Sequence, residues 1–162
     1  MSKSTYYPHI DGLRGVAVLL VLFFHLDLSP FEGGYIGVDV FFVISGYLIS
    51  TILINKIDNG TFSFKDFYLR RAKRLMPSML FVVILSMLMA YVIFPLSLFE
   101  RSLKSSTAAV LSFSNIFFFK ESGYFDSSAH LKPLLHTWSL AVEEQFYLIF
   151  PFLLIEWYFL YL

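Results

Sequence analysis

The sequence predicts an all-α protein, a polytopic bundle of transmembrane helices, and three observations point to this class. Of its 162 residues, 57% are hydrophobic and 20% aromatic, while only 15% are charged, against about 25% in a typical soluble domain. The mean hydropathy is +0.70, which leaves too few polar residues to cover a soluble surface. The apolar residues also form continuous runs, whereas the strands of a membrane barrel alternate apolar and polar residues.

Five apolar runs reach or approach the roughly 20 helical residues that cross a bilayer. The third contains no charged residue, the fourth is short and carries Lys104, and the fifth has three glutamates within it or at its edge. The runs are residues 13–29, 36–55, 75–99, 103–119 and 138–162. Because the last run ends without a polar flank or a helix stop signal, we expect about five spans that form a truncated part of a larger bundle.

The positions of lysine and arginine predict the orientation of a multi-pass protein in the plasma (inner) membrane. Six of the 12 basic residues lie between positions 56 and 74, in the loop expected after the second span. Basic loops stay in the cytoplasm, so the N-terminus is expected there too, with the turn at residues 30–37 outside. The fourth run leaves two alternatives. If it crosses the membrane, residues 120–136 are cytoplasmic, and if it is re-entrant, they are external.

Several classes of function lack their signals in this sequence. The net charge is zero, so no general basic field favours nucleic acid as a partner. The chain has no cysteine, which excludes disulfides, thiol nucleophiles and thiolate metal sites. Neither a phosphate-binding loop, a dinucleotide fingerprint nor a zinc-protease motif is present, and we expect no metal.

The first run carries polar side chains on one helical face. Arg14 and His25 are 11 residues apart, close to three full turns, and Asp11 lies one turn before Arg14. At about 1.5 Å per residue, Arg14 and His25 are roughly 16 Å apart along the axis. They can line a polar track but cannot touch. Polar groups in a span mark function, and His25 is a candidate general base toward a hydroxyl. The alternative is a helix-end histidine bonded to Asp27 or to nearby backbone.

Asp39 lies near the outer end of the second run. The turn between the two runs places it in the same outer half of the membrane as His25, where it can orient the imidazole as the third member of a triad does. The alternative is a carboxylate that stabilises the start of its own helix through the helix dipole.

A basic stretch precedes the third run. Arg71 and Arg74 are three residues apart, so on a helix both can face one anion. Arginine binds phosphate through paired N–H groups, which makes the pair a candidate clamp for a phosphorylated donor. The alternative is an anchor to anionic lipid.

Residues 136–147 form the densest polar segment of the chain. His136 and Glu143 are seven residues apart and share a helical face. No second histidine follows at the spacing of a zinc protease. The segment is either functional or a polar helix start at the membrane surface. Its candidate residues are His136, Ser139, Glu143 and Glu144.

Taken together, these segments resemble the acyltransferase-3 family of membrane acyltransferases, which would make residues 1–162 the N-terminal part of that membrane domain. The matching stretches occur in family order and cover nearly the whole chain. They are residues 7–15, Phe24-His25, 33–49, 71–77, Ser114-Asn115 and 135–147.

The resemblance implies transfer of an acetyl or short acyl group from cytoplasmic acetyl-CoA, or a related acyl-CoA, to a glycan hydroxyl. The acceptor would be a surface polysaccharide or lipid-linked glycan, such as lipopolysaccharide O-antigen. It implies a catalytic role for His25, a functional role for Arg14 and donor binding by Arg71 and Arg74. Two rival interpretations stay open: an inactive truncated membrane fragment, and a proton-coupled transporter or flippase, which also uses buried Arg, His and Asp.

Overall fold

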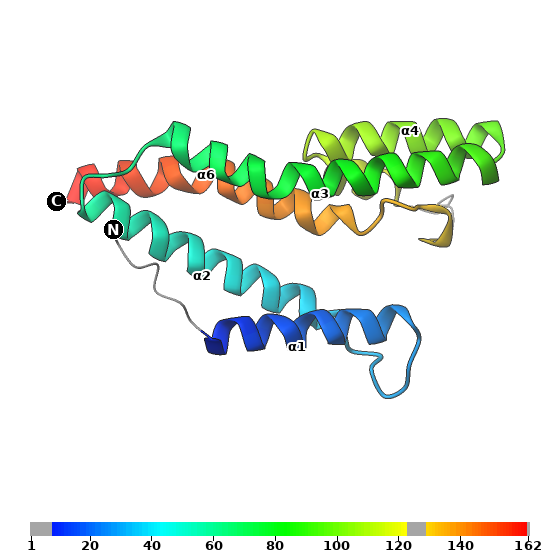
Figure 1. The fold of residues 1–162 in the computed structure, drawn as a ribbon, viewed down its shortest axis with the longest axis horizontal. Helices are drawn as coiled ribbons and strands as arrows, with labels where there is room; N and C mark the ends of the chain where they lie inside the picture. The colour runs from blue at the N-terminus through cyan, green and yellow to red at the C-terminus, as the bar shows by residue number, and fades with distance from the viewer. Residues whose placement is uncertain (1–7, 123–128, 162) are drawn as a thin grey trace. The chain divides into compact units, whose positions relative to one another are not determined.

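The computed structural model describes residues 8–122 and 129–161, and all regular structure within them is helical (Figure 1). This confirms the all-α prediction. The chain divides into two compact units, one ending at Asp58 and one beginning at Asn59. The elements are α1 (Pro8–His25), α2 (Ile36–Asp58), α3 (Phe64–Ile93), α4 (Leu96–Val110), α5 (Ser114–Glu121), a short 3-10 helix (Ala129–Leu131) and α6 (Thr137–Tyr161).

The first unit is a pair of helices, α1 and α2, that touch at two glycines. A Cβ atom at Gly34 would lie 2.2 Å from the carbonyl oxygen of Leu20, and one at Gly37 would lie 2.5 Å from that of Ala17. Only glycine permits so close an approach of two backbones, as small residues do between membrane helices generally. The glycines that the sequence places at the turn therefore fix how α2 meets α1.

Helix α3 begins earlier than the sequence analysis placed it. Ser63 is its N-cap, with a side chain that accepts a hydrogen bond from the backbone N–H of Asp66. This cap starts the helix at Phe64, so the basic stretch that was expected in a loop is helical. The 30 residues of α3 extend about 45 Å, longer than the roughly 30 Å hydrocarbon core. The helix can therefore hold its basic first turns outside the core while its apolar part crosses.

The fourth predicted run is not one helix. It breaks at Ser112, whose φ is +59°, a left-handed conformation that a continuous helix excludes. Helices α4 and α5 on either side, of 15 and 8 residues, are about 22 and 12 Å long, too short to cross alone. An ion pair of 2.8 Å between Arg101, near the start of α4, and Glu121, at the end of α5, shows that they form an antiparallel hairpin.

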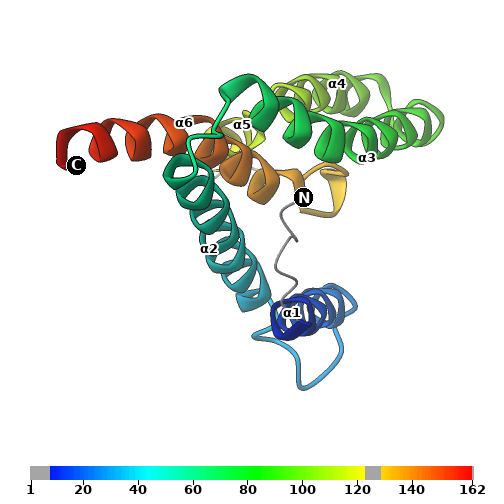
Figure 2. The same cartoon turned by 60° about the vertical axis from the view of Figure 1, so that its left-hand side comes forward.

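Helix α6 runs in the opposite direction to α3 (Figure 1). The ring of Phe64, the first residue of α3, stacks at 4.6 Å on that of Phe152 in the second half of α6. The second unit has its core beside the middle of α3, where buried side chains of α3, α4 and α5 meet Leu134, just before α6. The core residues are Met79, Val83, Ala109, Phe118 and Leu134. Figure 2 shows α5 beside the first turns of α6.

Four of the described helices are long and apolar enough to cross a membrane: α1, α2, α3 and α6. The sequence analysis expected about five spans. The difference is the α4–α5 hairpin, whose two short helices return to the end from which they start, the arrangement that the re-entrant alternative of the prediction requires. Residues 121 and 129–133 therefore lie at the same end of the unit as the α3–α4 turn; residues 123–128 lie outside the described part. Large apolar side chains on the spans are open to their surroundings, such as Val92 (80% exposed) and Phe159 (86%).

Candidate functional site

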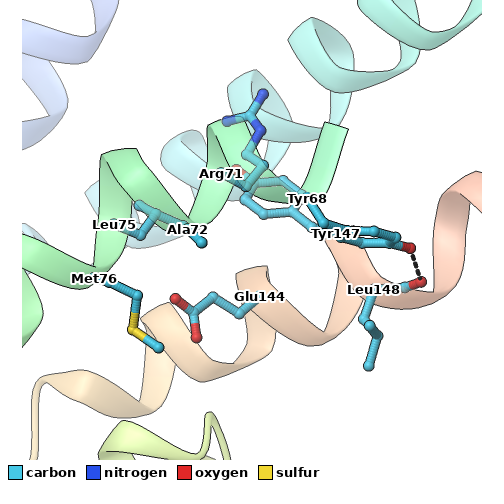
Figure 3. Close-up of a pocket in the computed structure, with 8 residues that line it drawn as sticks. All are labelled: Tyr68, Arg71, Ala72, Leu75, Met76, Glu144, Tyr147 and Leu148. Carbon is cyan, nitrogen blue, oxygen red and sulfur yellow. Dashed lines mark hydrogen bonds between the residues drawn. The ribbon is translucent and has the colours of Figure 1, made fainter. Parts of the chain in front are cut away.

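The second unit holds a groove between α3 and α6 (Figure 3). Its volume is about 220 Å³. Most of its wall is apolar, with one cationic and one anionic side chain at the surface, a composition typical of small-molecule sites. The lining residues are Tyr68, Arg71, Ala72, Leu75, Met76, Glu144, Tyr147 and Leu148.

Arg71 is the cation of this groove. The central carbon of its guanidinium lies 4.8 Å from the ring centre of Tyr147 and 5.9 Å from that of Phe67. Both distances fall within the roughly 6 Å range of cation–π attraction. Both rings are buried, with Tyr147 6% and Phe67 3% exposed. Helix α3 thus carries the guanidinium over aromatic faces from its own helix and from α6.

Arg74 does not join Arg71 in lining the groove. It lies one helical turn later, and its side chain is exposed. The structure therefore brings one of the two predicted donor-binding arginines to the groove and leaves the other at the surface of α3.

The neighbouring glutamates of α6 have different partners. Glu143 accepts a hydrogen bond from the hydroxyl of Tyr147, one turn further along the same helix. Glu144 accepts one from the hydroxyl of Ser112, at the tip of the α4–α5 hairpin, and also lines the groove. Consecutive side chains of a helix point about 100° apart, which explains how one carboxylate supports Tyr147 while the next ties α6 to the hairpin.

A second link between the hairpin and α6 was missed by the sequence analysis. The amides of Asn115 and Gln145 form two reciprocal hydrogen bonds of 3.0 Å, and Gln145 also donates to the carbonyl oxygen of Ser112 at 2.8 Å. The sequence gives one hint, because Ser112 interrupts an apolar run. The pairing of Asn115 with a residue 30 positions away follows only from the fold.

The start of α6 holds the other two predicted residues. His136 precedes the helix and has an exposed side chain, while the hydroxyl of Ser139 donates to the His136 carbonyl oxygen at 3.1 Å. Neither residue lines the groove. Thr137, the first residue of α6, receives a 2.8 Å hydrogen bond at its carbonyl oxygen from the buried Ser114.

In the first unit, α1 has a polar residue near each end. Arg14 forms a 3.9 Å ion pair with Asp11, so these side chains share a face as the spacing predicted. His25 is the last residue of α1, and its Nδ1 lies 2.8 Å from the carbonyl oxygen of Val21. A carbonyl only accepts hydrogen bonds, so Nδ1 carries the proton. In a neutral ring Nε2 is then the acceptor, the form that a general base requires.

The predicted orienting role of Asp39 finds no contact in the described part of the chain. No hydrogen bond or ion pair joins Asp39 to His25 there, and the backbone of Val21 already holds the imidazole. Asp39 lies in the first turn of α2, where a carboxylate stabilises the helix dipole.

The loop after His25 encloses a cavity of about 280 Å³. The ring of Phe24, one of its walls, meets the imidazole edge-on at 5.4 Å between centres. The other lining residues are Asp27, Leu28, Phe31 and Glu32. Among the described residues, no cluster of three histidine, aspartate or glutamate side chains gathers as at a metal site.

The described sites thus comprise a histidine at a helix end, bonded to nearby backbone as the alternative interpretation expected, and an arginine over two buried rings. The chain belongs to the acyltransferase-3 family, because the family model described as an acyltransferase domain matches residues 7–161.

Individual relatives have more specific names than the family model. The chain is 44% identical over 153 residues to the peptidoglycan O-acetyltransferase OatA of Listeria monocytogenes, with 93% of this chain and 24% of OatA covered. It is 42% identical over 152 residues to YrhL of Bacillus subtilis, named as a candidate peptidoglycan O-acetyltransferase, with the same shares covered. The chain thus spans about a quarter of the length of these relatives. No solved structure matches it significantly.

Proposed function

We propose that this chain carries the donor-binding and proton-transfer residues of a membrane O-acetyltransferase that uses acyl-CoA and a glycan acceptor. The observation that carries the proposal is the hydrogen bond from His25 Nδ1 to the Val21 carbonyl, which leaves Nε2 to accept a proton in a chain of this family.

The donor would be acetyl-CoA, bound from the cytoplasm as a substrate. Arg71 in the groove would contact its phosphates, since guanidinium groups bind phosphate through paired N–H donors. Arg74, one turn away and exposed, would add positive charge at the surface of α3. The positive-inside rule supports a cytoplasmic position for this end of α3 and for the N-terminus.

The reaction would be acyl transfer from sulfur to oxygen. His25 Nε2 takes the proton of the acceptor hydroxyl, and the oxygen attacks the thioester carbonyl carbon. The C–S bond breaks, the ester forms, and the proton passes to the departing thiolate. Arg14 lies roughly 16 Å along the helix axis from His25, too far to act on the same atom, so its role would be at the donor end beside Asp11.

The acceptor would be peptidoglycan, a glycan with free hydroxyl groups, rather than the O-antigen that the resemblance first implied. The support is the name of the relative OatA, a peptidoglycan O-acetyltransferase. The loop cavity offers an approach to His25, because Phe24 forms both its wall and an edge contact with the imidazole. Asp27 and Glu32 there can accept hydrogen bonds from sugar hydroxyls.

The decisive experiment measures alkali-labile acetyl ester on the peptidoglycan of cells that lack the endogenous activity. The cells carry the complete membrane protein, its His25→Ala variant, the 162-residue chain or an empty vector, with protein in the membrane quantified in each. We expect ester from the complete protein and none from His25→Ala at equal abundance. Ester at the normal level in the variant would exclude the proposed base. Consumption of acyl-CoA by purified protein separates acyl transfer from the transporter alternative, and the 162-residue chain tests the fragment alternative.

A further inference from the structure

We propose that Tyr147 and Glu143 are positioning residues for the donor: Glu143 holds the ring of Tyr147, and this ring holds the Arg71 guanidinium where it meets the donor phosphates. The inference rests on the proposed donor binding by Arg71 and assigns a role to one glutamate of the α6 segment.

The first step is the contact between Arg71 and Tyr147. The 4.8 Å separation of the guanidinium carbon from the ring centre is the shorter of the two cation–π contacts of Arg71. Because Tyr147 is only 6% exposed, water competes little for its face, and such attraction is stronger when desolvated.

The second step is the hydrogen bond between Tyr147 and Glu143. The two residues are one turn apart on α6, and the phenol donates to Oε1 of Glu143. The bond fixes the phenol at its far end while the ring face contacts Arg71. A hydroxyl that donates to a carboxylate also shifts electron density toward the ring, and hydrogen bonds to charged groups are stronger than neutral ones.

The third step is why this arrangement suits a phosphate site. A guanidinium contacts a ring through its face and an anion through N–H groups in its plane. One arginine can therefore stack on Tyr147 and bind phosphate at the same time. Fixing a long side chain in advance lowers the entropy lost when the ligand binds. Tyr147 would thus act on donor affinity rather than on the acyl-transfer step.

The test compares two donors in the purified complete protein. Acetyl-CoA carries phosphates, and S-acetylpantetheine has the same thioester without them. Tyr147→Met fills similar space without an aromatic face, and Tyr147→Phe keeps the ring but loses the hydroxyl. Glu143→Gln retains an acceptor oxygen, whereas Glu143→Leu removes it. Phe159→Leu, at an exposed position of the same helix, controls for loss of an aromatic side chain.

For Tyr147→Met we expect the KM of acetyl-CoA to rise about 2- to 30-fold, the range that a lost cation–π contact gives. The KM of S-acetylpantetheine and kcat at saturating donor should stay within about 2-fold of the wild type. Glu143→Leu should raise the KM of acetyl-CoA less than Tyr147→Met, and Glu143→Gln should restore it. If the Tyr147→Met protein does not accumulate, Tyr147→Phe provides the same test, with a smaller expected rise in the KM of acetyl-CoA.

The outcomes separate this inference from the proposed function. Equal rises for both donors, or no rise in either Tyr147 variant while the wild type turns over acetyl-CoA, would overturn the positioning role alone. A wild-type protein that consumes neither thioester would overturn the proposed function, and this inference with it.

Discussion

The contact between α1 and α2 can be tested with one methyl group. Replacing Gly37 by alanine adds a Cβ that would lie 2.5 Å from the carbonyl oxygen of Ala17 and 2.8 Å from Cγ2 of Val21. The carbonyl belongs to the backbone of α1 and cannot rotate away, so the helices must separate. Gly46 provides a matched control, because a Cβ there meets nothing within 4 Å and the residue lies on the same helix.

The size of the effect follows from this distance. Atoms in ordinary contact lie about 3.5 Å apart or more, so α2 would move from α1 by roughly 1 Å near Gly37. Overpacking of this kind costs about 1–3 kcal/mol. For a chain of this length, that lowers the melting temperature by roughly 3–10 °C. Alanine at Gly46 removes only the flexibility of glycine, which is neutral or favourable by up to about 1 kcal/mol in a helix.

The assay is thermal unfolding of the purified protein in detergent, followed by intrinsic fluorescence, with both variants measured in parallel. We expect Gly37→Ala to melt clearly below the wild type and Gly46→Ala to melt at or above it. Equal melting temperatures for the two variants would refute the close backbone contact, and with it the arrangement that places the loop beside His25.

Three further predictions concern the hairpin and the loop. Gln145→Leu should lower the melting temperature, because it leaves the carbonyl of Ser112 without its donor at about 1–3 kcal/mol; an unchanged melting temperature would contradict the link between the hairpin and α6. Arg101→Leu should destabilise more than the double change Arg101→Leu with Glu121→Leu, since the single change leaves a partly buried carboxylate without its cation; the reverse order of melting temperatures would contradict the ion pair. Phe31→Leu should raise the KM of the glycan acceptor several-fold and leave acetyl-CoA hydrolysis without acceptor unchanged. A change in hydrolysis with an unchanged KM of the acceptor would contradict the proposal that the loop cavity binds the acceptor.

Length and apolar composition were sufficient to predict the helical class and four of the spans, because a bilayer dictates both. They failed at residues 103–119, where an apolar run conceals a turn. Ser112 adopts a left-handed backbone there because Glu144 and Gln145, more than 30 positions later, hold its side chain and its carbonyl. Such a long-range partner leaves no trace in local hydropathy.

The candidate site, too, was predicted only where local spacing determines the geometry. Helical spacing correctly placed Asp11 beside Arg14, because that distance is set within one helix. It could not show that Arg71 rather than Arg74 reaches the groove, since this depends on which side of α3 meets α6. The sharing of Tyr147 between Glu143 and Arg71 depends on the same packing and was not predicted.

The tip of the α4–α5 hairpin also has a consequence for the order in which the protein is made. Its polar groups at Ser112 and Asn115 are satisfied by α6, a helix that is synthesised after the hairpin. Unsatisfied backbone groups are excluded from the lipid interior. The nascent hairpin therefore lacks these partners until α6 has been made, and we expect it to reach its final packing only then.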